Sequence, residues 1–477
     1  MIPCPNCGAQ IQFRSPASVM AVCEYCKTTV LKELDAVKNL GKMSDVLEDY
    51  SPLQLNTSGI YGTHSFTIIG RLQLRYADGM WNEWYVMFEN GKTAWLSDAS
   101  GQYTMTTEVP ASNDLPPFSA LVPSQHYTLI GKSYTAADVR IADCIGGQGE
   151  LPFKIGSGWQ ARVADFRAGQ TFITLDYSES ETPKVFAGKA VTLEELKCQL
   201  LRDDERIKAA AENIKGKVIP MTCPHCGSST SFLPGLTSTL ICPSCHSQLD
   251  TSGSIAQVLA IGKKIEQVYT TLSLGAQANI AGKAYEIIGI LRRSDNENTE
   301  WTEYLLYSPK AGFLWIIETD DGWARATVLD EWPTWETEDV AVLNNTSFQK
   351  LYRYPARVSY AIGAFNWRVA IGYQTNNVEF QYGTFKLAAE ITDTEMTWSH
   401  STPISADQIH AWFGDTVKAQ KTATADTAKS TAIKFIWLVF LLNIIPIFLA
   451  PIVIIPVLIG AAALYFPALF LDSQKNE

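Results

Sequence analysis

The sequence predicts a mainly β protein of α+β class, built as a tandem duplication. Each half is a Cys4 zinc ribbon followed by a β-sandwich or barrel-like domain, and transmembrane helices follow the second half. Three observations predict this: two sets of cysteines with the same spacing, matching residues about 219 positions apart, and a long apolar stretch without charges near the C-terminal end. In chain order, the predicted segments are zinc ribbon 1 (1–30), β-rich domain 1 (50–190), a connecting helix (191–218), zinc ribbon 2 (219–250), β-rich domain 2 (268–415), a linker (416–432) and a transmembrane hairpin (433–471).

Each half begins with two Cys-x-x-Cys pairs, and 15 residues separate the second cysteine of a set from the third. This is the spacing of a structural zinc site, because two intervening residues let one tight turn direct both sulfurs at a single ion. Four thiolates fill a tetrahedral shell and leave no position for water, which predicts a structural role and not a catalytic one. The predicted ligands of the two zinc ions are Cys4, Cys7, Cys23 and Cys26 in the first half and Cys223, Cys226, Cys242 and Cys245 in the second.

Two other interpretations of the cysteines stay open. Disulfides or redox thiols are the first, although the repeated spacing and the absence of a secretory signal at the start of the chain argue against them. An iron site of rubredoxin type is the second. His225 and His246 lie beside the second set, but the first half has Asn6 and Lys27 at those places, so neither histidine is expected to bind metal.

The duplication extends beyond the cysteines. The matching segments include Phe66–Gly70 with Tyr285–Gly289 at an offset of 219, Trp81–Trp84 with Trp301–Tyr304 at 220, and Val191–Leu196 with Ile404–Ile409 at 213. A repeat of this length indicates two similar domains and not a solenoid of short repeats.

Within each half the residue pattern is mostly that of strands. Residues 81–88 and 92–96 are rich in aromatic and β-branched residues, and the turn at 89–91 joins them into a predicted hairpin. The glycine cluster Gly146–Gly149 is interpreted as a turn. The segment 192–215 differs, because it is rich in Glu, Leu, Lys and Ala, and its leucines recur at helical spacing, which predicts the connecting helix.

The Trp–Glu strands are the candidate ligand or partner surface. In a strand, Trp81 and Glu83 share one face, and Trp301 and Glu303 share the matching face in the second half. One interpretation is a ligand groove with the two glutamates as its acidic contacts. The other, which we favour, is a core aromatic residue beside a glutamate that pairs locally.

The apolar stretch near the C-terminal end predicts a membrane hairpin. Residues 435–471 contain no charged side chain over 37 positions, whereas about 20 residues suffice to span a bilayer as a helix. Prolines at 446, 451 and 456 interrupt the stretch, so two short spans are predicted, with one span and an interfacial piece as the alternative. Lysines precede the stretch and place the domains before it in the cytoplasm; they are Lys418, Lys421, Lys429 and Lys434.

Charge and missing motifs argue against nucleic-acid binding and catalysis. The net charge is −11, and an acidic body repels phosphate backbones. No histidine recurs at the repeat offsets, and the chain has no phosphate-binding loop, nucleophile elbow or His-Glu-x-x-His motif. The sequence therefore predicts a protein that is not an enzyme and is an unlikely nucleic-acid binder.

Several motifs resemble those of one known family. They are Cys4–Gly8, Val22–Cys26, Ser51–Leu55, Ile69–Arg71, Trp81–Tyr85 and Gly149–Pro152. The chain resembles, over both halves, an uncharacterised bacterial family that joins tandem zinc ribbons to a β-rich domain of unknown function and carries a C-terminal membrane anchor. The second half departs from the pattern at Tyr304 and at Ala364–Asn366. Members accompany membrane-stress proteins and enzymes like those of polyamine synthesis. The resemblance thus implies an accessory role at the bacterial inner membrane and supplies no catalytic residues.

Two functional hypotheses follow. The first is a non-enzymatic scaffold or sensor at the cytoplasmic face of a bacterial inner membrane, which binds a protein partner there in envelope stress. The second is an accessory module that binds a small cationic, polyamine-like ligand through its acidic surface and the Trp–Glu strands.

Overall fold

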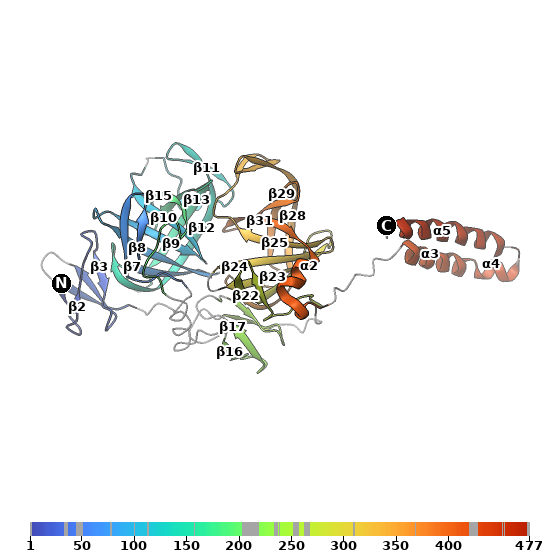
Figure 1. Cartoon of the computed structure of the whole chain (residues 1–477), viewed down its shortest axis with the longest axis horizontal. Helices are drawn as coiled ribbons and strands as arrows, with labels where there is room; N and C mark the ends of the chain where they lie inside the picture. Colours follow the sequence, from blue (N-terminus) through green and yellow to red (C-terminus); the bar gives the residue numbers. More distant parts are fainter. Residues whose placement is uncertain are drawn as a thin grey trace. The chain divides into compact units, whose positions relative to one another are not determined.

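The computed structural model consists of a compact unit, Met1–Val417, that holds two large β sheets, and a second unit, Lys418–Glu477, that is helical (Figure 1). The structure describes residues 2–32, 37–43, 51–76, 79–99, 101–111, 114–156, 158–202, 219–232, 237, 239–250, 257–261, 268–308, 311–367, 369–418, 428–450, 452 and 454–474. The prediction of a mainly β protein is confirmed.

Eight antiparallel strands of the first half form a closed sheet, here called barrel 1. Around the sheet the order is β7-β8-β9-β10-β15-β14-β13-β12, and β12 returns to pair with β7. The strands are β7 (His64–Tyr76), β8 (Gly79–Phe88), β9 (Thr93–Ala99), β10 (Gln102–Val109), β12 (Lys132–Leu151), β13 (Gln160–Ala168), β14 (Thr171–Asp176) and β15 (Lys184–Val191), with β6 (Ser58–Tyr61) beside β7, β11 (His126–Leu129) beside β12, and the short 3-10 helix η1 (Phe118–Ala120) between β10 and β11.

The second half repeats this arrangement in barrel 2. Its order is β22-β23-β24-β25-β31-β30-β29-β28, and β28 pairs with β22. The strands are β22 (Lys283–Ser294), β23 (Glu300–Ser308), β24 (Gly312–Thr319), β25 (Gly322–Val328), β28 (Thr346–Phe365), β29 (Gln374–Tyr382), β30 (Phe385–Ile391) and β31 (Met396–Ile404), with β21 (Gln277–Ile280), β26 (Thr334–Thr337) and β27 (Val340–Leu343) at the margins. Of the two predicted architectures, sandwich and barrel, the observed sheets are barrel-like.

A cysteine-containing ribbon is joined to each barrel by strand pairing. Ribbon 1 contains β1 (Ile2–Pro3), β2 (Gln10–Ile11), β3 (Met20–Val22), β4 (Thr28–Lys32) and β5 (Val37–Lys42); ribbon 2 contains β16 (Ile219–Thr222), β17 (Ser229–Phe232), β18 (Thr239–Ile241), β19 (Gln248–Asp250) and β20 (Gln257–Ala260). β3 pairs with β12, and β18 pairs with β28 in the same register. Each ribbon therefore extends the sheet of its barrel.

One glycine in each half lies where the barrel closes. Gly149 and Gly363 have φ angles of 67° and 92°, in the left-handed region that favours glycine. A Cβ on Gly149 would lie 2.2 Å from the carbonyl oxygen of Ile69, and one on Gly363 would lie 2.4 Å from that of Ile288. The cluster Gly146–Gly149 lies inside β12, so its interpretation as a turn is wrong.

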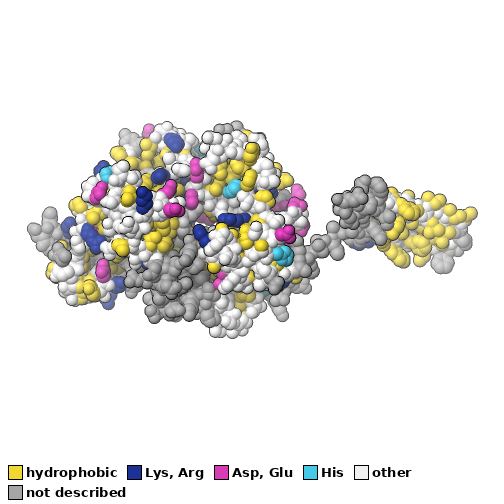
Figure 2. Space-filling model, in the orientation of Figure 1, with side chains coloured by type: hydrophobic (Ala, Val, Ile, Leu, Met, Phe, Trp, Pro, Cys, Tyr) yellow, Lys and Arg dark blue, Asp and Glu magenta, His cyan; other side chains and the backbone are white. Residues whose placement is uncertain are grey.

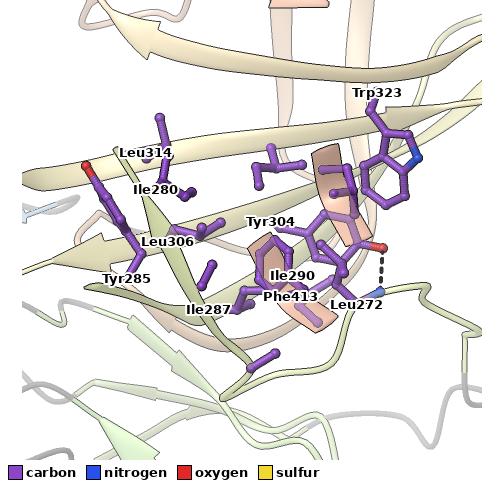
Figure 3. Packing of buried hydrophobic residues seen from close by; sticks show 14 residues of the cluster. Leu272, Ile280, Tyr285, Ile287, Ile290, Tyr304, Leu306, Leu314, Trp323 and Phe413 are labelled. Atoms are coloured by element: carbon purple, nitrogen blue, oxygen red, sulfur yellow. Dashed lines mark hydrogen bonds between the residues drawn. The ribbon is translucent and has the colours of Figure 1, made fainter. Parts of the chain in front are cut away.

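A hydrophobic core covers one face of β21–β25 in barrel 2 (Figure 3). Tyr304 stacks on Trp323 at 6.0 Å between ring centroids, and its hydroxyl accepts a hydrogen bond from the backbone N–H of Leu272. Helix α2 (Ala406–Phe413) closes this core with Ile409 and Phe413. The hydroxyl of Ser405 caps the helix by accepting from the backbone N–H of Gln408.

The matching segment of the first half is not helical. Thr192 and Glu195 form a reciprocal capping box, which is a true helix-start signal. Lys197 and Leu200 then adopt φ angles of 48° and 57°, so the chain leaves helical geometry after one turn. The predicted connecting helix is therefore absent from residues 191–202, and residues 203–218 lie outside the described part of the chain.

The second unit contains helices α3 (Ala428–Leu442), α4 (Ile444–Leu449) and α5 (Ile454–Gln474), and the short 3-10 helix η2 (Gly414–Thr416) ends the first unit. The apolar stretch is interrupted at Asn443 and at Ala450, which bound α4. Within the described residues, no helix combines the length and apolar character needed to cross a bilayer. The prediction of transmembrane helices at 433–471 is therefore not supported.

Candidate metal centres and the Trp–Glu strands

The structure brings each set of four cysteines together. Within each set, the four sulfur atoms lie within 4.8 Å of one another. Cross-pair Sγ–Sγ distances are 3.6 Å for Cys4–Cys26, 3.7 Å for Cys7–Cys23, and 3.8 Å for both Cys223–Cys245 and Cys226–Cys242. Four sulfurs bound tetrahedrally at about 2.3 Å from a zinc ion would be about 3.8 Å apart, whereas a disulfide joins sulfurs at about 2.05 Å. The two groups are therefore compatible with two zinc ions and not with disulfides.

Backbone hydrogen bonds shape the same turn at every cysteine pair. The N–H of Gly8 donates to the carbonyl of Cys4, and that of Gly227 donates to Cys223, both at 2.9 Å. These glycines have φ angles of 77° and 76°, in the left-handed region that favours glycine. In the second pairs, Lys27 and His246 stand at the equivalent place with φ angles of 58° and 56°.

A neighbouring hydroxyl favours the thiolate form of one cysteine in each centre. Thr28 lies 3.2 Å from the sulfur of Cys26 and lowers the pKa of that thiol to about 5. Ser247 lies 3.3 Å from the sulfur of Cys245 at the equivalent position. Metal ligation requires deprotonated thiols, so this environment suits it. Burial raises the pKa of Cys242, in the second group, to about 12, and it raises the pKa of Cys144 and of Cys198, which lie outside both groups, to about 11.

Glu150 ties ribbon 1 to barrel 1. Its carboxylate accepts hydrogen bonds from the backbone N–H groups of Arg14 and Ser15, at 2.8 and 3.1 Å, and from the hydroxyl of Ser18, at 2.6 Å. Glu150 is buried and lies opposite Ala21 of β3, whereas the residue opposite Leu240 of β18 in the second half is Ala364. The second half therefore lacks this carboxylate.

In barrel 1, the glutamate of the Trp–Glu strand pairs locally. Glu83 accepts a hydrogen bond from the indole N–H of Trp81 at 2.8 Å and from the hydroxyl of Ser97 at 2.7 Å. Burial raises the pKa of Glu83 to about 7, against the effect of these hydrogen bonds. The negative charges of Asp165 and Asp176 raise it further.

In barrel 2, the same indole contact is joined by an arginine. The indole N–H of Trp301 donates to Glu303 at 2.7 Å. Arg293 is 5% exposed and lies 3.4 Å from Glu303 and 3.0 Å from Glu390, measured between nitrogen and oxygen. Burial raises the pKa of Glu303, and the positive charge of Arg293 opposes that shift. Burial alone would lower the pKa of Arg293, but the carboxylates of Glu303 and Glu390 hold it above its ordinary value.

Strand pairing shows that the arginine is particular to barrel 2. Arg293 lies opposite Trp301, and the residue opposite Trp81 is Leu74. Glu390 lies opposite Asn377, and Asp176 lies opposite Val163 at the matching register. Each barrel thus holds acidic residues at two equivalent positions, and among the residues that the structure describes only those of the second barrel have an arginine paired with both.

The two barrels also contact each other through charged side chains. Arg140 of β12 pairs with Glu395 at 2.7 Å and with Asp138, and its guanidinium lies 3.8 Å from the ring centre of Tyr76. Burial raises the pKa of Asp138 to about 7, although the charge of Arg140 opposes this. The backbone N–H of Val139 donates to the carbonyl of Thr394 at 2.9 Å, which adds strand-like pairing across the contact.

Sequence reasoning named the eight cysteines and both Trp–Glu strands but missed Arg293, Glu390, Asp176 and Glu150 as site residues. A signal for them was present in the repeat. At an offset of 214, Asp176 matches Glu390, and at 219, Leu74 matches Arg293. These residue differences between equivalent strands of the two halves are visible in the sequence.

Comparison with known proteins adds one finding about the barrels. Residues 54–193 and 273–406, together more than half of the chain, match the family model of a domain of unknown function, DUF4178. These ranges contain both barrels. No curated protein and no solved structure matches the chain.

Proposed function

Because the chain belongs to the DUF4178 family, whose function is unknown, we propose a function from the geometry of this chain. It is a non-enzymatic scaffold, stabilised by two zinc ions, that attaches to a lipid surface through its C-terminal helices and binds a protein partner there. The lipid surface is that of a bacterial inner membrane, with the barrels on the cytoplasmic side.

The apolar surface of helices α3 to α5 carries this proposal (Figure 2). α3 and α5 pack against each other but leave many large hydrophobic side chains in contact with solvent, with Leu449 82% exposed. Monomeric soluble proteins rarely expose contiguous apolar patches larger than a few hundred Å². The most exposed side chains of the group are Trp437, Leu441, Leu442, Ile445, Leu449, Ile452, Ile459 and Phe466.

A lipid surface suits this pattern better than a partner helix does. Adjacent positions such as Trp437 and Leu438, or Leu441 and Leu442, are all exposed, so the apolar surface is wider than the narrow stripe that one partner helix covers. No charged side chain occurs from 435 to 471. Lysines before this stretch would be attracted to anionic headgroups.

The first unit supports the scaffold role. Four sulfurs close each candidate metal centre, so a metal there would lack an open position for substrate. The contacts of Arg140 and Val139 across the two barrels make one compact body that can present a partner surface. The net charge of −11 disfavours nucleic acid as that partner.

Vesicle flotation of the full chain tests the proposal. We expect the protein to float with vesicles of phosphatidylethanolamine and phosphatidylglycerol, and a triple variant, Trp437→Lys, Leu441→Lys and Ile445→Lys, to remain at the bottom of the gradient. Lysine on an apolar surface opposes insertion into hydrocarbon. The matched control is Tyr25→Lys, because Tyr25 is a highly exposed aromatic residue of ribbon 1.

A wild-type chain that does not float would contradict attachment to lipid. Self-association that the triple variant abolishes would instead assign the helices to a second copy of the chain. Crosslinking of the vesicle-bound protein in a bacterial lysate, followed by mass spectrometry, then tests for a partner; the absence of any reproducible crosslink to barrels or ribbons would remove the scaffold role.

A second candidate function is binding of a small cation in barrel 1. Glu83 has two acidic neighbours and, among the described residues, no ion-pair partner, whereas Glu303 already pairs with Arg293. We therefore expect a polyamine or similar cation to bind at Glu83 and not at Glu303. Titration calorimetry with Glu83→Gln and Glu303→Gln checks this, and equal heats for Glu83→Gln and the wild type would exclude the site.

A further inference from the structure

Barrel 1 contacts barrel 2 through an open edge of strand β12. This strand pairs with β11 at one end and with β7 at the other, so its middle, residues 136–143, pairs with β13 on one side only. The turn between β30 and β31 of barrel 2 lies along this open edge. The backbone N–H of Val139 donates to the carbonyl of Thr394 at 2.9 Å, and Arg140 pairs with Glu395 at 2.7 Å.

The tip of the β13–β14 hairpin completes the contact between the barrels. The backbone N–H of Trp332 donates to the carbonyl of Gly169 at 3.1 Å, and the side-chain amide of Gln170 donates to Glu331 at 3.0 Å. The guanidinium of Arg167 lies 5.4 Å from the ring centre of Trp332. Barrel 1 therefore presents a strand edge and a hairpin tip to barrel 2.

Barrel 2 has the same strand edge, and there it is open. At an offset of 214, Val139 matches Arg353, and the register shifts between Ala136 and Asp138 in β12 and between Lys350 and Tyr352 in β28 align at the same offset. β28 pairs with β27 at one end and with β22 at the other, so its middle, residues 351–356, pairs with β29 on one side. Among the residues that the structure describes, no strand pairs with the other side of this segment.

The open edge of β28 is short. The N–H of Lys350 donates to the carbonyl of Asp339 at 2.8 Å, and Pro355 has no N–H to offer. Arg353 lies between these two residues, at the position that matches Val139. A long partner strand would lack donors here, whereas a turn like the one that binds Val139 fits the available length.

Aromatic side chains surround this edge and the tip of the matching hairpin, β29–β30. Tyr352, Tyr382 and Phe385 are 59%, 56% and 44% exposed, and Arg353 is exposed as well. Phe385 stacks on His400 at 5.8 Å between ring centroids, which holds the ring in place and reduces the entropy lost on binding. Tyrosine and arginine are among the residue types enriched in the energetically important parts of protein interfaces.

Barrel 1 carries an exposed counterpart of the turn that barrel 2 uses. The turn of barrel 2 is Thr392–Glu395, in which a hydroxyl residue alternates with an acidic one. At an offset of 214 it matches Ser178–Glu181, which has the same alternation and lies in the longer turn between β14 and β15. The side chain of Glu181 is 75% exposed, although it pairs with Arg162 at 2.9 Å.

We propose that the open edge of β28 binds the turn Ser178–Glu181 of a second copy of the chain. The N–H of Arg353 donates to the carbonyl of Ser180, as Val139 donates to Thr394 within one chain, and the positive charge of Arg353 attracts the acidic turn. The two surfaces differ, so the contact is heterologous, and each end of a dimer keeps an unused turn or edge. Copies therefore assemble head to tail, independently of the lipid attachment proposed above.

Sedimentation equilibrium of the zinc-loaded full chain, in dodecyl maltoside micelles that cover α3 to α5, tests this contact. We expect the average mass of the wild type to rise with concentration beyond that of a dimer. A turn variant, Glu179→Lys with Glu181→Lys, and an edge variant, Arg353→Glu with Tyr382→Ser, should each associate at least about tenfold more weakly. The matched control Lys283→Glu reverses an exposed charge of barrel 2 in the β21–β22 hairpin and leaves association unchanged.

A mixture of the two variants tests the head-to-tail arrangement. The turn variant keeps its edge and the edge variant keeps its turn, so an equimolar mixture should form a dimer and no larger species, although neither variant associates alone. The proposal fails if the wild type stays monomeric up to about 100 μM, if both variants associate like the wild type, or if the mixture stays monomeric.

Two further measurements keep these outcomes decisive. Zinc content and near-ultraviolet circular dichroism equal to those of the wild type show that each variant is folded, and Arg353→Glu alone replaces the edge variant if Tyr382→Ser impairs folding. Both variants should float with vesicles as the wild type does. A failure of lipid attachment and a failure of the contact between copies are therefore observed separately.

Discussion

Barrel 1 and barrel 2 each hold a glutamate at an equivalent position, but the charged groups around the two carboxylates differ. Glu83 and Glu303 both accept a hydrogen bond from the tryptophan two residues earlier, at 2.8 and 2.7 Å. Glu303 is also paired with the buried Arg293, where barrel 1 has Leu74. Two barrels with one strand order can therefore differ in charge balance, because the backbone hydrogen bonds that close the sheet are independent of the side chains on its faces.

The ribbon–barrel junctions differ in the same way. Glu150 joins ribbon 1 to barrel 1 through three hydrogen bonds, and Ala364 at the matching position cannot. The first half thus has a polar connection at the junction and an acidic residue without a cation in the barrel. The second half has an ion pair in the barrel and no carboxylate at the matching junction position. Four predictions test this comparison.

Removal of one metal centre is expected to have the largest effect. Cys23→Ser and Cys242→Ser each remove one ligand, and zinc-ribbon folding draws on roughly 10 kcal/mol of metal binding. Each variant should retain one zinc ion of two, and its own ribbon should become sensitive to protease. Because Glu150 still holds ribbon 1, cleavage in Cys23→Ser should be slower than in Cys242→Ser. Elemental analysis measures the zinc content, and limited proteolysis measures the rate of cleavage. A well-folded wild-type protein that contains no metal would contradict the assignment of two metal centres.

Loss of the buried arginine comes next. Arg293→Met leaves Glu303 and Glu390 without their cation, and breaking a buried ion pair costs about 3–5 kcal/mol. Urea unfolding at pH 7 measures the loss, and Arg353→Met, at an exposed arginine of the same barrel, is the control. Adding Glu303→Gln to Arg293→Met should restore part of the stability, since it removes one unpaired charge and approaches the composition of barrel 1. An unchanged unfolding midpoint for Arg293→Met would show that the pair is not buried as described.

Loss of the junction carboxylate is expected to have a smaller effect. Glu150→Ala leaves the N–H groups of Arg14 and Ser15 without their acceptor, at a cost of about 2–3 kcal/mol. Amide hydrogen exchange should accelerate at these two residues, while exchange at the amides of β8 should remain as in the wild type. Exchange that stays slow at Arg14 and Ser15 would mean that Glu150 does not hold the ribbon.

The smallest expected effect is on the pH dependence of stability. Glu83 has a pKa of about 7 in the folded protein and an ordinary value of 4.5. The folded state therefore holds the proton at higher pH than the unfolded chain, so the free energy of unfolding falls as the pH rises from about 4.5 to about 7. Glu83→Gln cannot ionise, and its stability should fall less over this range, by on the order of 1–2 kcal/mol.

The matched variant in barrel 2 sharpens this last test. Glu303→Gln removes a partner of Arg293, so it should destabilise the protein at pH 7. Because burial also raises the pKa of Glu303, this variant should flatten the pH profile as well, and the loss of stability at pH 7 distinguishes it from Glu83→Gln. Chemical unfolding at several pH values measures both variants. Parallel profiles for Glu83→Gln and the wild type would contradict the raised pKa of Glu83.

Local sequence signals predicted some elements and misled at others. The hairpin at β8–β9 was predicted, because its turn and its alternation are encoded within a few residues. The leucine spacing from Thr192 onward predicted a long helix, and Thr192 and Glu195 do form a capping box. The left-handed residues Lys197 and Leu200 nevertheless end the turn, while Leu196 remains buried. Val191–Leu196 and Ile404–Ile409 match in sequence, yet only the second segment leads into a helix, which begins at Ala406.

The sequence by itself determined the features that depend on neighbours along the chain. The Cys-x-x-Cys spacing, the glycine after the first pair of each set and the strand pattern each depend on a few neighbouring residues. These local patterns therefore suffice to predict ribbons and β domains.

Only the tertiary structure decided which distant groups meet. Arg293 reaches Glu390 across 97 positions of the chain, and Glu150 reaches Ser15 across 135. Gly149 is required because it lies close to the backbone of β7, with which β12 pairs where barrel 1 closes, and no local pattern marks that contact. Contacts of this kind follow from the closure of the sheet, which brings together strands that are far apart in the sequence.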